Sequence, residues 1–294
     1  MLRCVNAVFN VVTQANVDPF FHEATNTWSY LVSDPETGAA AIVDPVMDFD
    51  ASSGRIGAKS VGQIIEAVND RQLKVQWVLE THAHADHLTA AQIIKRSLGG
   101  EIAIGRGIQQ VQKHFSEVFQ IAADGDLFDR LFNAGEQFSI GSIPVQVVAT
   151  PGHTPDSLTY RLPGAAFIGD TLFAPDYGTA RCDFPGGNAA QLYQSIQTLY
   201  GFGDETVLYL CHDYPGPGLA PRCCFTVGEQ RTGNVHIGQD TTEEQFVALR
   251  TTRDAELSVP KLIIPSLQVN MRAGHLPEPE DNGLAYLRWP LDAF

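Results

Sequence analysis

The chain has few cysteines, few positive charges and no long apolar run, and each shortage argues against a class of protein. Five of the 294 residues are cysteines, two of them adjacent, and no apolar secretion signal opens the chain, so we expect reduced thiols in a cytoplasmic protein. Lysine and arginine total 19 against 34 acidic residues, and the net charge of −15 argues against binding to nucleic acid or an anionic membrane. No stretch approaches the roughly 20 apolar residues that span a bilayer.

The segment THAHADH at residues 81–87 is the most informative part of the chain. It brings together four side chains that can bind a metal: His82, His84, Asp86 and His87. An apolar run that predicts a buried strand precedes it, and residues 88–98 are expected to form a helix. Imidazoles and a carboxylate without a thiolate indicate Zn, Fe or Mn and argue against a cysteine-based structural zinc site.

Alternating strands and helices along the chain predict the α/β class. Ser60 and Gln63 have the spacing of a capping box for a helix over residues 60–71, and Gly99 is expected to end the helix before it. The remaining elements are a helix at 189–200 and strands at 38–44 (ending in a carboxylate), 75–80, 144–149, 165–168 and 206–211. Segments 215–224 and 275–283 are rich in Pro and Gly or polar residues and are expected to be loops.

Three more polar residues follow predicted strands: His153, Asp170 and His212. Ligands in α/β folds collect at the carboxyl ends of strands, so we expect these residues to join the THAHADH segment in a divalent-metal site. Four other histidines are expected to be capped or to face solvent: His22, His114, His236 and His275.

THAHADH, His153 in GHT, Asp170 in GDT and His212 together resemble the metallo-β-lactamase superfamily over residues 25–215. The resemblance implies an αββα sandwich, in which two mixed β-sheets face each other under flanking helices and the metal lies at one edge. Since such a sandwich is one domain, residues 1–294 are expected to form a single domain with a C-terminal extension from about residue 215.

Longer segments resemble the persulfide dioxygenase family, and its bacterial β-lactamase-like hydrolase branch in particular. They are THAHADHLTAA, GHTPDSLTYRLPG, GDTLFAPDYGTARCDFPGG, HDYPG, RTGNVHIG and PSLQVNMRAGHLPEPEDNG. The resemblance implies one Fe(II) per chain, bound by His82, His153 and Asp170, and oxidation of glutathione persulfide with O2 and water to sulfite and glutathione. Two imidazoles and one carboxylate leave coordination positions open for both reactants. His84, Asp86, His87 and His212 would orient ligands and bound water.

An acidic protein needs local cations to bind glutathione, which carries two carboxylates. Arg181 resembles a family arginine near the active site and is suited to a bidentate carboxylate clamp, and Tyr214 is placed to donate its hydroxyl to the substrate. Further substrate-binding candidates are Arg222, Arg231, Lys261 and Arg272.

Two other functions stay open. All seven ligands used by the glyoxalase II type of thioesterase are present, so a second metal and hydrolysis of acyl-glutathione are alternatives. A less favoured alternative is a non-catalytic metal or persulfide sensor. The sequence also leaves a homodimer open.

Overall fold

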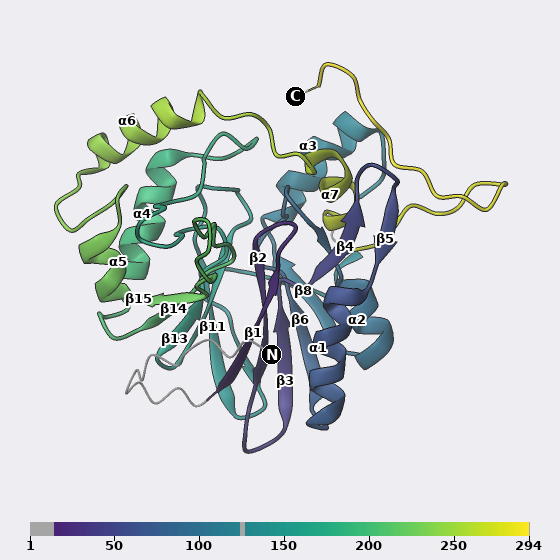
Figure 1. Cartoon of the computed structure of the whole chain (residues 1–294), viewed down its shortest axis with the longest axis horizontal. Helices are drawn as coiled ribbons and strands as arrows, with labels where there is room; N and C mark the ends of the chain where they lie inside the picture. Colours follow the sequence, from purple (N-terminus) through teal and green to yellow (C-terminus); the bar gives the residue numbers. More distant parts are fainter. Residues whose placement is uncertain (1–14, 124–126, 294) are drawn as a thin grey trace.

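Two mixed six-stranded sheets lie at the centre of residues 15–123 and 127–293, the part of the chain that the computed structural model describes (Figure 1). In spatial order, the first sheet contains β1 (Asn16–His22), β2 (Thr27–Ser33), β3 (Ala39–Val43), β6 (Lys74–Leu79), β8 (Glu101–Gly105) and β9 (Arg130–Phe132). The second contains β10 (Gln137–Ile140), β11 (Ile143–Ala149), β12 (Leu158–Leu162), β13 (Ala165–Phe167), β14 (Val207–Tyr209) and β15 (Cys224–Thr226). A small sheet joins β5 (Arg55–Gly57), β4 (Val46–Asp50) and β7 (Leu88–Thr89).

Apolar side chains from the two sheets pack against each other. Tyr30 and Val43 from the first sheet and Val147 and Tyr160 from the second belong to one buried cluster, and none is more than 2% exposed. Burial of each such side chain contributes on the order of 1.5–3 kcal/mol, so this contact is a main source of stability.

Helices cover the outer faces of both sheets (Figure 1). The first sheet packs against α1 (Lys59–Asp70), α2 (Ala91–Leu98), α3 (Ile108–Phe119) and α7 (Ile263–Asn270). The second packs against α4 (Ala189–Tyr200), α5 (Val227–Gly233) and α6 (Glu243–Asp254). The predicted αββα sandwich and the predicted bounds of α4 are therefore confirmed.

Two local predictions are wrong. Helix α1 begins at Lys59, and its N-cap residue Ala58 makes no side-chain hydrogen bond. Ser60 instead donates from its backbone N and its Oγ to Asp48, at 3.0 and 2.5 Å. A tertiary carboxylate thus replaces the local capping box. Helix α2 begins only at Ala91, because residues 88 and 89 pair with β4 as a short strand.

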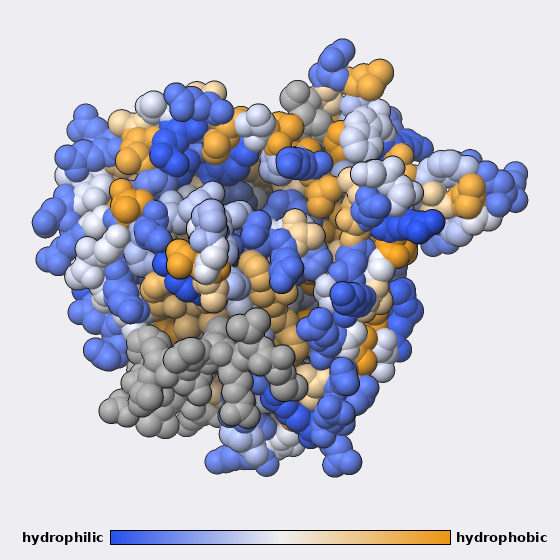
Figure 2. Space-filling view, viewed as in Figure 1, coloured by the Kyte–Doolittle hydropathy of each residue, from blue (hydrophilic) through white to orange (hydrophobic). Residues whose placement is uncertain are grey.

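The chain after residue 215 contributes to both outer layers and to the second sheet. Strand β15 pairs antiparallel with β14, and α7 packs into the cluster under the first sheet. The last described residues form an irregular arm, yellow in Figure 1, which carries exposed Leu284, Tyr286 and Trp289 among hydrophilic side chains (Figure 2). None of the helices in the described ranges combines the length and the apolar character that a membrane crossing requires.

Candidate metal centre

The strand ends bring the metal-type side chains of the sequence to one edge of the molecule. The segment with His82 and His87 follows β6 of the first sheet, whereas His153, Asp170 and His212 follow β11, β13 and β14 of the second. Strands β13 and β14 are parallel, and β11 runs in the same direction because β12 is antiparallel to both of its neighbours. Their carboxyl ends therefore lie at one edge of the second sheet, where the potential ligand atoms approach those of the segment after β6.

His82, His153 and Asp170 form the first group, in which the potential ligand atoms all lie within 4.8 Å of one another. His153 Nδ1 donates to the carbonyl oxygen of Arg181 at 2.7 Å, so its Nε2 is free to face Asp170, at 3.7 Å. His82 Nδ1 lies 3.0 Å from the hydroxyl of Thr81, which itself donates to Asp44 at 2.9 Å. Since that hydroxyl proton is already used, His82 Nδ1 is the donor and Nε2 carries the free lone pair.

The second group consists of His84, Asp86, His87 and His212, again with potential ligand atoms within 4.8 Å. His212 Nε2 lies 3.2 Å from Asp86 Oδ2 and 3.4 Å from Asp170 Oδ1. Asp170 therefore lies between the two groups, with one oxygen toward His153 and the other toward His212.

Buried polar atoms without hydrogen-bond partners are concentrated here. Of ten such atoms in the described residues, six lie at this centre: His82 Nε2, His84 Nδ1, His87 Nδ1 and Nε2, Asp170 Oδ1 and His212 Nε2. Buried polar atoms in folded proteins almost always have a hydrogen-bond partner, because a buried donor or acceptor without one costs about 1–3 kcal/mol. Imidazole nitrogens and carboxylate oxygens facing one another in this way fit divalent cations, so the centre is a metal-binding site.

Asp44 contacts the Nε2 atom of His84. The residue follows β3 with a φ of 47°, accepts from Thr81 N at 2.8 Å, and lies 3.0 Å from His84 Nε2. Burial raises the pKa of Asp44 to about 6, although hydrogen bonds from Thr81 lower it. Sequence reasoning found the carboxylate at the end of this strand but did not include it in the site, since only the fold brings it next to residue 84.

Asn270, at the end of α7, holds the backbone of the metal loop. Its Nδ2 donates to the carbonyl oxygens of His84 and His87, both at 2.7 Å, and its Oδ1 accepts from Thr89 N at 2.8 Å. Asn270 is 4% exposed, and its three side-chain hydrogen bonds all go to residues 84–89. No motif in the sequence had indicated that this residue belongs to the site.

Burial sets the protonation state of the groups. Burial lowers the pKa of His82 well below its usual value, and the neighbouring His84 and His153 lower it further, so the imidazole is neutral and able to coordinate a metal. Burial also raises the pKa of Asp170, while His212 and His153 oppose the shift. The Cys211 thiol is a further potential ligand atom, within 4.8 Å of those of Asp170 and His212, and burial raises its pKa well above the usual value.

Two of the predicted substrate-binding residues lie beside these groups. Arg181 offers its carbonyl to His153, while its guanidinium pairs with Asp183 at 2.5 Å and donates to Ser258 O at 2.7 Å. The ring of Tyr214 stacks on His212 with centroids 5.9 Å apart, and the half-exposed Tyr177 stacks on Tyr214 at 4.6 Å.

The other four predicted cations lie in different surroundings. Arg222 pairs with Asp213, next to His212, at 3.3 Å. Arg231 pairs at 2.6 Å with Asp204, which precedes β14 and so lies at the end of that strand away from His212. Lys261 is exposed before α7, and Arg272 is partly buried just after it.

Residues 22–212 match the Metallo-beta-lactamase superfamily. The chain belongs to this superfamily. Its αββα sandwich is the metallo-beta-lactamase fold, which it shares with a metallo-beta-lactamase of Staphylococcus aureus at 20% identity and a TM-score of 0.69, over 91% of this chain and 76% of that one. The family match ends at His212, so α5, α6 and α7 lie outside the part of the chain that this match covers.

Curated relatives resemble nearly the whole chain. A probable metallo-hydrolase of Burkholderia pseudomallei is 49% identical over 94% of this chain and 99% of its own length. Glyoxylase B2 of Dictyostelium discoideum is 40% identical over 95% and 98%, and persulfide dioxygenase ETHE1 of Mus musculus is 29% identical over 86% and 87%. The chain spans only 65% of the beta-lactamase hydrolase-like protein of Agrobacterium fabrum, at 49% identity over 94% of the chain.

Among solved structures, ETHE1 from Myxococcus xanthus superposes with a TM-score of 0.72 at 28% identity. The superposition covers 88% of this chain and 100% of that one. The resemblance to the superfamily predicted from the motifs is thus confirmed, and the choice between its reactions depends on the chemistry of the two ligand groups.

Proposed function

We propose that this metallo-beta-lactamase superfamily protein is an iron-dependent persulfide dioxygenase. In the proposed reaction one glutathione persulfide, one O2 and one water give glutathione, sulfite and two protons. The observation that carries the proposal is the group of His82, His153 and Asp170, two imidazoles and a carboxylate with their inner atoms facing one another. This donor set is typical of Fe(II) oxygenases because it leaves coordination positions open. The similarity to the mouse persulfide dioxygenase and to the Myxococcus ETHE1 fold supports the same choice.

When bound, Fe(II) would supply the centre at which a persulfide sulfur and O2 exchange electrons. The protein's residues provide the setting for that chemistry. Thr81 and the Arg181 carbonyl hold the two imidazoles with Nε2 directed inward. His82 is 1% exposed and Asp170 is 7% exposed, so the surrounding fold excludes bulk water. We expect the Arg181 guanidinium to bind a glutathione carboxylate and the Tyr214 hydroxyl to donate to the substrate.

A binuclear thioesterase is the second candidate, and a specific observation favours it. His84, Asp86, His87 and His212 form their own group, and both ring nitrogens of His87 lack a hydrogen-bond partner. These residues would hold a second divalent ion beside the first group, and two ions would supply an activated water for attack on a thioester. The relatives named probable metallo-hydrolase and glyoxylase B2 fit this reading as well.

Metal stoichiometry and substrate separate the candidates. Purified protein should contain about one iron per chain and consume O2 when glutathione persulfide is added, with sulfite appearing in equal amount. About two metals per chain, together with hydrolysis of S-lactoylglutathione and no O2 uptake, would establish the thioesterase instead. Binding of persulfide without turnover of either compound would favour the sensor.

A further inference from the structure

A chain of hydrogen bonds leads from the outer nitrogen of His212 to the edge of the molecule. His212 Nδ1 lies 3.3 Å from Thr27 Oγ1, which lies 2.7 Å from Thr25 Oγ1. Thr25 Oγ1 lies 2.8 Å from His22 Nδ1, and the other ring nitrogen of His22 lies 3.3 Å from Asp48 Oδ1. Three side chains, those of His22, Thr25 and Thr27, thus connect the Asp48 carboxylate of β4 with a histidine at the metal centre.

One backbone carbonyl sets the direction of donation along this chain. His212 Nδ1 also lies 3.2 Å from the carbonyl oxygen of Asn26, which can only accept, so Nδ1 carries the proton. Thr27 Oγ1 then accepts from His212. It can donate to Thr25, whose hydroxyl oxygen lies 2.7 Å away and whose carbonyl oxygen lies 3.3 Å away, and Thr25 Oγ1 can donate to His22 Nδ1. His22 is left with its proton on Nε2, facing Asp48. Every group therefore has the role that its neighbour requires. The Nε2 of His212 faces Asp86 and Asp170, and Asp170 belongs to the proposed iron-binding group.

The hairpin of β1 and β2 holds the residues of this hydrogen-bond chain in place. His22 and Thr27 are paired across the hairpin, and Thr27 forms an isolated β-bridge with His212. The next residue, Trp28, donates its backbone N–H to Cys211 O at 2.7 Å. The hairpin of the first sheet is thus joined to the end of β14 in the second, directly at the metal centre.

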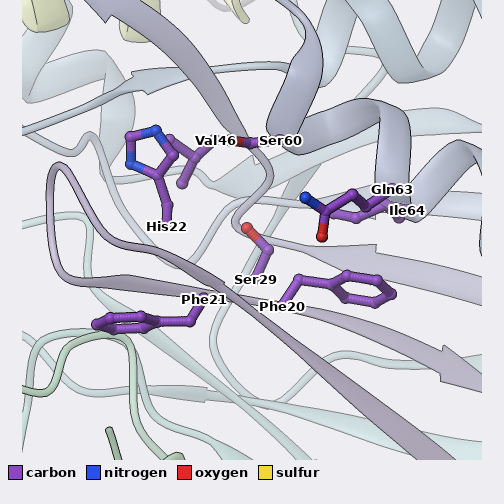
Figure 3. A pocket seen from close by; sticks show the side chains of 8 residues that line it. All are labelled: Phe20, Phe21, His22, Ser29, Val46, Ser60, Gln63 and Ile64. Carbon is purple, nitrogen blue, oxygen red and sulfur yellow. The ribbon is translucent and has the colours of Figure 1, made fainter. Parts of the chain in front are cut away.

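The far end of the chain borders a small cavity (Figure 3). His22, Ser29, Ser60 and Gln63 line it together with apolar side chains, and it offers about 20 Å³ to water. A single water needs about 10–15 Å³ and several polar partners, and this cavity provides both. Burial lowers the pKa of His22, Asp48 and Glu23 raise it, and His87 lowers it, which agrees with a neutral ring that accepts at Nδ1.

We propose that His22 is a positioning residue for the metal centre, acting on His212 through the hydroxyl groups of Thr25 and Thr27. The inference rests on metal binding at this centre, as the proposed function does, but not on the identity of the substrate. Outer hydrogen bonds of this kind commonly change metal affinity or activity about 10–100-fold when they are removed.

Valine and serine variants test the chain, because valine keeps the shape of threonine and removes the hydroxyl, whereas serine keeps the hydroxyl. The measurement is the rate at which a chelator removes iron from the loaded protein. We expect T27V to lose metal about 10–100-fold faster than wild type and T25V and H22F to lose it about tenfold faster. T27S and T25S should restore slow release. In the metal-free protein, the Nδ1–H proton resonance of His212 should shift in T25V and H22F, which do not touch that ring.

A double-variant cycle separates coupling from local damage. If the groups act as one chain, T27V/H22F should release metal no faster than T27V alone. Additive effects, an unshifted His212 resonance, or equal loss in T27S and T27V would overturn the proposal. If H22F does not fold, T27V/T25V provides the same comparison. Failure of the proposed function would be seen separately, as absence of O2 uptake by the wild-type protein while the release rates still respond.

Discussion

The side-chain amide of Asn270 donates to the carbonyl oxygen of His87 at 2.7 Å, across 183 residues of sequence. The same Nδ2 donates to His84 O, so one amide fixes the backbone on both sides of Asp86. Helix α7 lies beyond the segment that matches the superfamily, yet it sets the shape of the loop that carries three histidines. We infer that the C-terminal part of this chain is needed for the geometry of its metal centre.

Asn270→Asp should weaken metal binding strongly. The aspartate has nearly the same shape, but it cannot donate, so two buried carbonyl oxygens lose their partner and face a negative charge. Each loss costs about 1–3 kcal/mol. We expect a lower unfolding temperature and at least a tenfold loss of metal affinity, measured by thermal denaturation and by titration with Fe(II) under anaerobic conditions.

Gln268→Glu is the matched control, because Gln268 is another buried amide of α7, whose Nε2 donates to Ile264 O and Arg288 O. This variant should lower the unfolding temperature while its metal affinity remains that of the wild type. Equal metal affinities in the two variants would show that Asn270 acts only on stability.

His153→Ala should abolish iron retention and O2 uptake. The change removes one of two imidazoles from the first group and leaves the carbonyl of Arg181 without its donor. Iron per chain and O2 consumption should both fall to background. His114→Ala removes an exposed histidine of α3 and should change neither quantity. Full activity of the His153 variant would remove this residue from the ligand set.

The sequence predicted the parts of the centre that depend on local pattern. The apolar segments that precede His153, Asp170 and His212 contain strands, as predicted, because alternation and β-branched content are local properties. These strands run in the same direction, so the polar residues that follow them lie at one edge. Helix α4 was predicted to the residue, since its buried stripe coincides with an Asn188 cap that accepts from Gln191 N.

The contacts that hold the ligands were not predictable in this way. Asn270 and Thr27 act through tertiary hydrogen bonds to residues more than 180 positions away, and an amide or hydroxyl carries no spacing that identifies its partner. His22 was expected to be capped or to face solvent, and it is capped by Thr25 and Asp48, but its connection to His212 depends on the fold. The failed cap at Ser60 has the same cause, since Asp48 reaches it from another strand.

Arg181→Ala should raise KM for glutathione persulfide more than it changes kcat. The substitution removes the guanidinium but keeps the backbone carbonyl that accepts from His153, so iron content should stay at the wild-type level. Steady-state O2 uptake over a range of persulfide concentrations measures both constants. Arg130→Ala is the matched control, because it removes an exposed arginine of β9 that pairs with Glu136. It should leave KM and kcat unchanged. If the Arg181 variant keeps the wild-type KM, its guanidinium only joins Asp183 to Ser258.

Asp34→Asn should destabilise the protein in a pH-dependent way. Asp34 follows β2 and accepts from Ser142 N and Oγ, at 2.7 and 2.8 Å, so it links the first sheet to the turn between β10 and β11. These bonds and that from Thr37 hold the pKa of Asp34 well below its usual range. A carboxylate with a lowered pKa contributes its full stability above the unfolded value of about 3.9 and loses it as the pH falls further. The gap in unfolding temperature between variant and wild type should therefore be constant from pH 7 to 5 and narrow below about pH 4.

Asp50→Asn is the control: it removes hydrogen bonds within one exposed turn and should give a smaller gap in unfolding temperature at every pH. A gap for Asp34→Asn that widens in acid would show that its ionised form does not stabilise the contact.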